Sequence, residues 1–190
     1  MQEKLTLEEQ KTLLRLAREA MERAVRDEEL LPLDLTSLPL ALCGEGSSFV
    51  TLTSGGLLRG CIGALEACQP LAEDVRVHAI AAARKDPRFP SVHEEELSTI
   101  QIEVSRLTRP TPLVYKDAED LLSKLRPQVD GVILCDNSRR RVTFLPQVWA
   151  KIPDPAQFLN NLCYKMGLEP DAWCRMHFEV LTYQAEEFHE

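Results

Sequence analysis

Long hydrophobic runs are missing from the sequence. No apolar stretch approaches the about 20 residues that a membrane-spanning helix needs, and the first residues run directly into an amphipathic pattern, so we expect no membrane span and no signal peptide. Positive charge is also scarce, because 22 Lys and Arg oppose 30 Asp and Glu and leave a net charge of −8. Non-specific binding to nucleic acid or to an anionic membrane depends on a basic surface. The charge balance therefore argues against both, and we expect a cytoplasmic protein.

Several catalytic motifs are absent as well. The sequence contains no phosphate-binding loop, no dinucleotide-binding glycine pattern and no Gly-x-Ser-x-Gly motif. The usual nucleotide-driven enzymes and serine hydrolases therefore have no support. The six cysteines include no Cys-x-x-Cys pair, so we interpret them as free thiols and predict neither a disulfide framework nor a metal site. The sequence identifies no cofactor and no oligomeric state.

The hydrophobic periodicity that is present predicts an α+β fold in a single domain spanning residues 1–190. Apolar residues recur at helical spacing in four segments: 6–25, 70–85, 117–125 and 155–166. Patterns typical of β-strands occur in six others: 48–53, 57–63, 98–107, 131–135, 141–145 and 174–183. Because hairpins alternate with single helices, we expect a mainly antiparallel sheet flanked by helices. We place a larger lobe at about 1–110 plus 150–190 and a smaller lobe at about 111–149.

The segment 57–63, Leu-Leu-Arg-Gly-Cys-Ile-Gly, is unusual for a strand that only has to pack. In an extended strand Arg59, Cys61 and Gly63 share one face, with Arg59 and Cys61 about 7 Å apart. A cation at that range favours a thiolate, whereas Gly60 and Gly63 suggest a bulge or the close approach of a ligand. The functional interpretation is a ligand-facing patch with a reactive Cys61. The structural interpretation is a hairpin strand with a buried cysteine and an arginine paired to a carboxylate.

Further candidate residues lie beyond this strand. Cysteine catalysis requires a base within hydrogen-bond reach, and His93, which follows Asp-Pro-Arg-Phe at 86–89, is the histidine to test first. Arg88 adds a second positive charge in the same loop. Glu103 lies on the polar face of a later strand, where it is either a partner for Arg59 or an exposed carboxylate.

A run of basic residues, Arg139, Arg140 and Arg141, crowds the tip of the second predicted hairpin. Such a run is usually solvated, although three guanidinium groups can also hold a phosphate. Direct RNA binding would require this run to outweigh the acidic remainder of the chain.

The segment 58–63, Leu-Arg-Gly-Cys-Ile-Gly, resembles the signature of the AMME chromosomal region domain family, whose prokaryotic members are called AmmeMemoRadiSam system protein A. Three further stretches agree with the family pattern: Asp-Pro-Arg-Phe at 86–89, Thr-Phe-Leu-Pro-Gln-Val-Trp at 143–149 and Leu-Cys-Tyr-Lys-Met-Gly-Leu at 162–168. The segment 103–110 departs from it, because the family usually shows an apolar residue at the position of Arg106 and a second proline near Arg109.

The resemblance implies a two-part fold in which the signature lines a cleft between two lobes, and genes associated with a Memo-like protein and a radical SAM protein. It implies no known reaction. Our hypothesis is an enzyme or enzyme component acting on a small or modified anionic substrate, with Cys61 and His93 as catalytic residues. Five residues would bind the substrate: Arg59, Gly60, Gly63, Arg88 and Glu103. The alternative is a non-catalytic adaptor that docks a partner protein, with Arg59 as its anchor. It predicts that Cys61→Ser preserves function whereas Arg59→Ala abolishes it.

Overall fold

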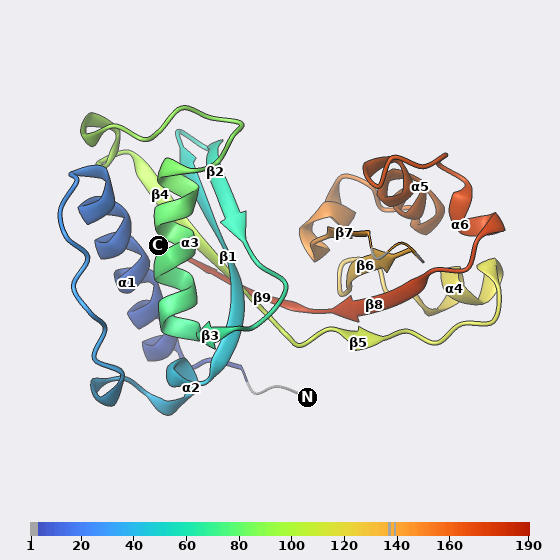
Figure 1. Cartoon of the computed structure of the whole chain (residues 1–190), viewed down its shortest axis with the longest axis horizontal. Helices are drawn as coiled ribbons and strands as arrows, with labels where there is room; N and C mark the ends of the chain where they lie inside the picture. The colour runs from blue at the N-terminus through green and yellow to red at the C-terminus, as the bar shows by residue number, and fades with distance from the viewer. Residues whose placement is uncertain (1–3, 137, 139) are drawn as a thin grey trace. The chain divides into compact units, whose positions relative to one another are not determined.

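The chain folds into two compact units, each with its own hydrophobic core (Figure 1). This computed structural model describes residues 4–136, 138 and 140–190. Unit 1 comprises Met1–Thr108 and Glu186–Glu190, and unit 2 comprises the residues between them, 109–185. The α+β class with antiparallel sheets is confirmed. Among the described residues, no helix is both long and apolar enough to cross a membrane.

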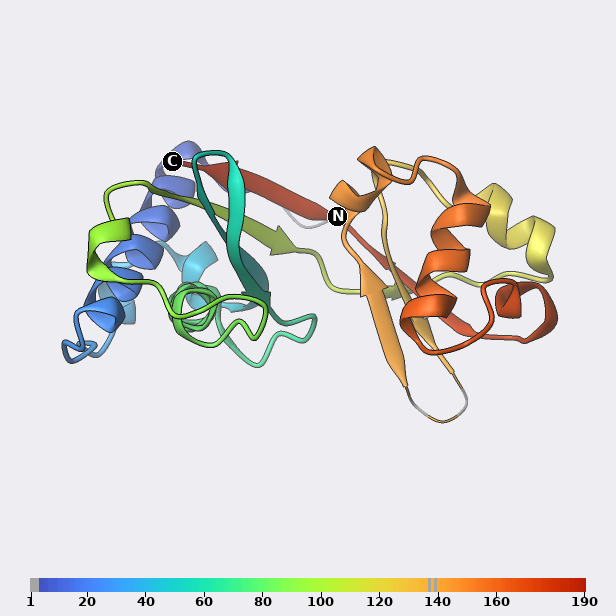
Figure 2. The same cartoon turned by 90° about the horizontal axis from the view of Figure 1, so that it is seen from above.

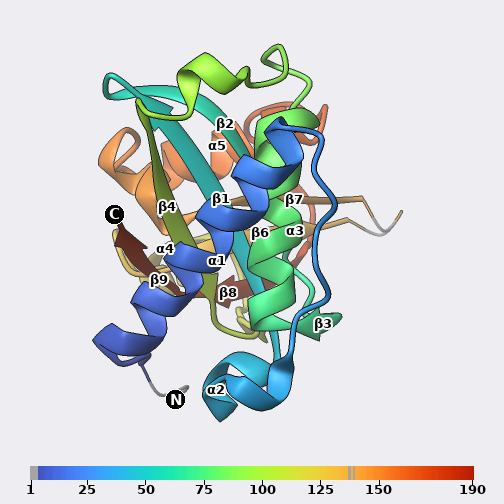
Figure 3. The same cartoon turned by 90° about the vertical axis from the view of Figure 1, so that its left-hand side faces the viewer.

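Unit 1 is a sheet covered on one face by two helices. Its strands follow the order β2-β1-β4-β9, and β3 pairs with β1. The helices α1 and α3 lie side by side against β1 and β4 (Figure 3). The bounds of these elements are α1 Leu7–Val25, α2 Leu40–Cys43, β1 Glu45–Ser54, β2 Leu57–Gly63, β3 Gln69–Pro70, α3 Leu71–Arg84, β4 Ile100–Leu107 and β9 Ala185–His189.

The alternation of β1 separates the two faces of this sheet. Val50 and Leu52 enter the core beneath α1 and α3, whereas Phe49 and Thr51 point to the opposite face. A turn at Gly55 and Gly56, both with positive φ, returns the chain into β2. The predicted hairpin is therefore confirmed, and β2 lies at the edge of the sheet.

The end of the chain returns to unit 1 through β9. Glu186 accepts a hydrogen bond from the Leu5 backbone N–H at 3.1 Å and pairs with Arg106 at 3.2 Å. The Glu190 carboxylate pairs with Arg18 of α1. Of the residues after Thr108, only 186–190 belong to unit 1.

Unit 2 contains a second sheet of order β5-β8-β6-β7, and α5 lies beside its β6–β7 hairpin (Figures 1 and 2). The Trp149 ring is fully buried and stacks on Phe158 of α5 at 3.6 Å between ring centroids. Arg140 pairs with Asp136 at 2.7 Å, whereas Arg139 of the predicted arginine run, like Asn137 of the predicted turn, lies outside the described residues. The elements are β5 Thr111–Pro112, α4 Ala118–Lys124, β6 Gly131–Cys135, β7 Arg141–Phe144, α5 Pro155–Lys165, α6 Ala172–Arg175 and β8 Glu179–Tyr183.

Two expectations about this part of the chain are corrected. The prediction placed 150–190 in the larger lobe, but 150–185 belong to unit 2, because α5 and α6 pack on the core of the second sheet. The predicted strand at 174–183 begins only at Glu179, since Ala172–Arg175 is a helical turn. That turn is held by Trp173, whose ring N–H donates to Asn160 of α5 at 2.7 Å.

Candidate functional site

A bulge in β2 sets the position of Arg59. Leu52 of β1 pairs with Gly60, but the next residue, Thr53, pairs with Leu58, so Arg59 has no partner in β1. The Arg59 guanidinium donates to Glu96 at 2.7 and 3.0 Å and to the carbonyl oxygens of residues 90 and 91 at 2.9 and 3.2 Å. Its side chain is only 14% exposed. Arg59 therefore holds the loop that follows α3.

Of the two alternatives for Glu103, the pairing with Arg59 is wrong. It required β2 and β4 to be neighbours, whereas β1 lies between them. The carboxylate partner is Glu96, which ends the short 3-10 helix Glu94–Glu96. Sequence reasoning had no signal for Glu96, because it stands in a run of three similar glutamates.

This ion pair predicts a defined dependence of stability on pH. Arg59 chiefly, helped by the His93 backbone N–H, holds the pKa of Glu96 at about 2, below its ordinary 4.5. A depressed carboxyl pKa adds stability above the unfolded-state pKa and loses it as the pH falls toward the folded-state pKa. We expect Glu96→Gln to cost about 1–2 kcal/mol at neutral pH. The difference from wild type should shrink between pH 4.5 and about 2.

Urea unfolding of both proteins across this pH range measures the effect. Glu95→Gln, in the same short helix, is the matched control and should show no pH-dependent difference. A Glu96→Gln deficit that stays constant down to the acid limit would contradict the assignment of the stabilising charge to Glu96.

Asp86 and Arg88 bind the backbone of Cys61. The Cys61 N–H donates to Asp86 at 2.8 Å, and Arg88 donates to the Cys61 carbonyl at 3.1 Å. Arg88 also donates to Asp86 from its backbone and from Nε and Nη2, at 3.1, 2.9 and 2.7 Å. The Asp86 side chain is 2% exposed, and the Arg88 guanidinium holds its pKa well below the usual range. The Asp-Pro-Arg-Phe stretch and the signature strand are therefore bonded to each other.

Two polar groups lie near the Cys61 sulfur, the Thr51 hydroxyl and the Arg88 guanidinium. The Thr51 hydroxyl donates to the half-buried sulfur at 3.3 Å. Asp86 first and the Cys61 sulfur second raise the pKa of the Arg88 guanidinium, against an opposing effect of burial. A neighbouring cation and a hydrogen-bond donor are the two kinds of group that stabilise a thiolate. Arg88 is thus a cation close to the sulfur, whereas a contribution from Arg59, which donates to Glu96 and to the loop after α3, stays a prediction.

The two glycines of the signature allow the protein's own chain to approach closely. A Cβ at Gly60 would lie 2.2 Å from the carbonyl oxygen of Ala82 in α3. A Cβ at Gly63 would lie 2.4 Å from the Ser48 carbonyl oxygen and from the Phe49 ring. The expected close approach occurs, but its partners are an adjacent helix and strand, which leaves the predicted substrate contact at these glycines without support.

His93 and Glu103 differ in how they are connected to Cys61. The His93 backbone N–H donates to Glu96 at 2.8 Å, its side chain is exposed, and among the described residues no hydrogen bond joins it to Cys61. Its role as a base stays a prediction. Glu103 pairs with Thr51, which in turn pairs with Cys61, so the three residues form one row across the sheet.

Sequence reasoning missed Asp86 and Thr51. The i,i+2 spacing of Asp86 and Arg88 around a proline was a usable signal for a tight local ion pair. Thr51 could be recognised only with the strand register. In the described part of the chain, no group of three or more His, Cys, Asp or Glu could hold a metal ion.

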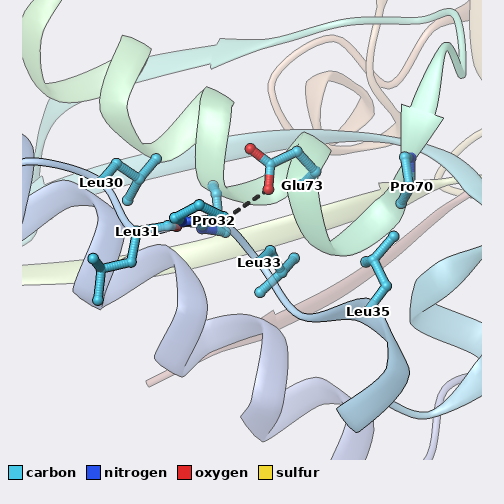
Figure 4. Close-up of a pocket in the computed structure, with 8 residues that line it drawn as sticks. Leu30, Leu31, Pro32, Leu33, Leu35, Pro70 and Glu73 are labelled. Carbon is cyan, nitrogen blue, oxygen red and sulfur yellow. Dashed lines mark hydrogen bonds and ion pairs between the residues drawn. The ribbon is translucent and has the colours of Figure 1, made fainter.

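A hollow of about 370 Å³ lies elsewhere in unit 1, between the leucine-rich segment 30–35 and the start of α3 (Figure 4). The ion pair of Arg76 with Glu73, at 2.7 Å, forms one side of it. Arg76 also donates to the Leu31 carbonyl at 2.5 Å, so this arginine holds the segment against the helix. None of the residues that line the hollow belongs to β2 or to the loop after α3.

Comparison with known proteins finds a matching family, related sequences and a solved structure of similar fold. The AMMECR1 family pattern matches residues 14–188. A protein from Methanothermobacter thermautotrophicus is 41% identical over 189 residues, covering 98% of this chain and 96% of the relative, and Protein MK0488 from Methanopyrus kandleri is 38% identical, covering 100% and 92%. The crystal structure of the uncharacterized protein PH0010 from Pyrococcus horikoshii superposes with a TM-score of 0.87 at 35% identity, covering 98% of this chain and 93% of that one. The resemblance of the signature is confirmed, and the chain belongs to the AMMECR1 family.

Proposed function

We propose that the protein is an enzyme or enzyme component that uses Cys61 as a nucleophile or carrier, with Arg88 orienting an anionic group of a small or modified substrate. The observation that carries the proposal is the pair of groups at the half-buried sulfur, the Arg88 guanidinium and the Thr51 hydroxyl. Both are of the kind that activates a cysteine. A cysteine that only packed would need neither.

The exposure of Arg88 supports its role toward a ligand. Its side chain is 53% exposed although Asp86 holds it in place. A guanidinium that is fixed and still accessible can meet a carboxylate or phosphate without first being ordered. Arg59, in contrast, donates its hydrogen bonds to the loop after α3, so we assign it a positioning role.

The adaptor alternative depended on Arg59 as the anchor for a partner protein. Because that side chain is 14% exposed and bonded within unit 1, Arg59→Ala would disturb the loop rather than remove a docking contact. The adaptor hypothesis therefore has less support than the hypothesis of a catalytic cysteine. The association with Memo-like and radical SAM proteins stays a prediction from the family resemblance.

The thiols of the chain provide an internal test of Cys61. At neutral pH we expect iodoacetamide to modify Cys61 about tenfold faster than Cys68 and Cys174, which are more exposed. Burial raises the pKa of the Cys135 and Cys163 thiols, so both should react slowly. Peptide mass spectrometry over a time course gives all rates in one sample.

Arginine variants then identify the activating group. Arg88→Gln should bring the Cys61 rate down to that of the exposed cysteines, whereas Arg175→Gln, which removes a similarly exposed arginine in unit 2, should leave the Cys61 rate unchanged. His93→Gln lowers the rate only if the ring reaches the sulfur. A wild-type Cys61 slower than Cys68 and Cys174 would remove the catalytic proposal.

A further inference from the structure

Opposite charges lie at the two ends of one row on the open face of the unit 1 sheet. Cys61 of β2, Thr51 of β1 and Glu103 of β4 are directly paired residues, so their side chains share the face turned away from α1 and α3. Adjacent strands are about 4.8 Å apart, which places Glu103 about 10 Å from Cys61. Arg88 stands at the Cys61 end of this row.

The Glu103 end offers negative charge that the protein leaves uncompensated. Glu103 is half-buried, and within the described residues its carboxylate has no hydrogen bond or ion pair, although its backbone pairs with β1. Desolvation first, and the repulsion of Glu103 second, raise the pKa of the Glu187 carboxyl in β9. The neighbouring carboxylate thus adds to the negative charge instead of neutralising it.

An aromatic ring borders the same row. Phe49 lies two residues from Thr51 on β1, hence on the same face, and is only half-buried. The Phe49 ring occupies the space that a side chain at position 63 would need, which is why Gly63 fits there. Aromatic rings and carboxylates together are the groups with which proteins bind ammonium and guanidinium ions.

We infer that the substrate of the Cys61 site is a small zwitterion, whose anionic group faces Arg88 and whose ammonium or guanidinium group binds at Glu103 about 10 Å away. The inference rests on the proposed function, since it describes the molecule that the thiol would meet. A substrate with an acid alone would make no contact with Glu103, and a substrate with an amine alone would make none with the exposed Arg88 guanidinium.

Charged thiol reagents measure this preference at Cys61 itself. The three probes are methyl methanethiosulfonate, its trimethylammonioethyl analogue and its sulfonatoethyl analogue. In each reaction the thiolate attacks the sulfenyl sulfur, a disulfide bond forms, and methanesulfinate leaves with the electron pair. Rates are divided by the rate of the neutral reagent, which removes differences in intrinsic reactivity.

Glu103→Gln should lower the relative rate of the cationic probe about threefold, as expected for one charge at this distance in a partly solvated site. Arg88→Gln should lower the relative rate of the anionic probe. The matched control is Glu119→Gln, which removes one negative charge from α4 in unit 2 and should change neither ratio. Equal ratios in wild type and Glu103→Gln would overturn the inference while leaving Cys61 as a nucleophile.

A second measurement does not depend on thiol reactivity. An ammonium-bearing nitroxide should broaden the amide resonances of Thr51 and Glu103 more than a carboxylate-bearing nitroxide does, and Glu103→Gln should abolish the difference. If Cys61 reacts with none of the reagents, the proposed function fails, and the nitroxides still decide the charge preference. Equal broadening by the two nitroxides in wild type would overturn the inference.

Discussion

Gly60→Ala is expected to destabilise unit 1 by about 3 kcal/mol, because the added methyl group would meet backbone rather than a mobile side chain. The new Cβ would lie 2.2 Å from the Ala82 carbonyl oxygen. Removing this clash requires α3 and β2 to move apart. That movement opens the core in which Val50 and Leu52 pack against α3. Each lost contact there adds to the cost of the strain.

Hydrogen exchange of peptides from α3 and β1 measures the loss, since both tryptophans, Trp149 and Trp173, report on unit 2. Gly44→Ala is the matched control. Gly44 has φ of −72° and no atom within 4 Å of a new Cβ, so alanine fits without strain and restricts the unfolded chain. Unchanged protection of α3 in Gly60→Ala would show that helix and strand yield easily at this contact.

Asp86→Asn is expected to destabilise unit 1 by about 2–3 kcal/mol and to slow modification of Cys61. The substitution keeps the shape but removes the charge that Arg88 and the Cys61 N–H share. Arg88, already 53% exposed, would then be free to turn toward solvent and away from the sulfur. If Asp86 acted only as a nearby negative charge, its removal would favour the thiolate and speed the reaction. The direction of the rate change therefore separates positioning from simple electrostatics.

The chain contains a second ion pair of the same construction. Asp130 is equally buried and accepts from the Arg126 backbone, Nε and Nη2 at 3.2, 3.0 and 2.6 Å. Asp130→Asn should therefore destabilise unit 2 by a similar amount without altering the Cys61 rate. If both variants slow Cys61 equally, general loosening of the protein explains the effect, and Asp86 has no special role.

Local periodicity was enough to predict most elements of the fold. The helices at α1, α3 and α5 and the hairpin of β1 and β2 follow from spacing, capping residues and turn glycines, all of which act within a few residues. The Thr6 and Glu9 capping box, for example, is formed as its spacing predicts. Long-range packing decided what local patterns could not, such as the helical turn that Trp173 fixes.

The candidate site was only partly predictable for the same reason. Its cysteine stood out by composition, but the choice between Arg59 and Arg88 as its cation depended on a bulge. One extra residue at Arg59 breaks the regular alternation on which a shared face for Arg59 and Cys61 was based. Register and bulges result from pairing with a distant strand, and a single sequence carries no direct record of that pairing.

The hydrogen bonds of Asp86 and Arg88 to the Cys61 backbone also have a consequence for self-association. A strand at the border of a sheet normally offers free amide and carbonyl groups to which the strand of another molecule can add. At Cys61 these groups are already occupied, by Asp86 and by Arg88. The loop thus takes the place of an incoming strand, and a mutation that loosens it would expose a template for aggregation as well as a thiol able to cross-link the chains that gather there.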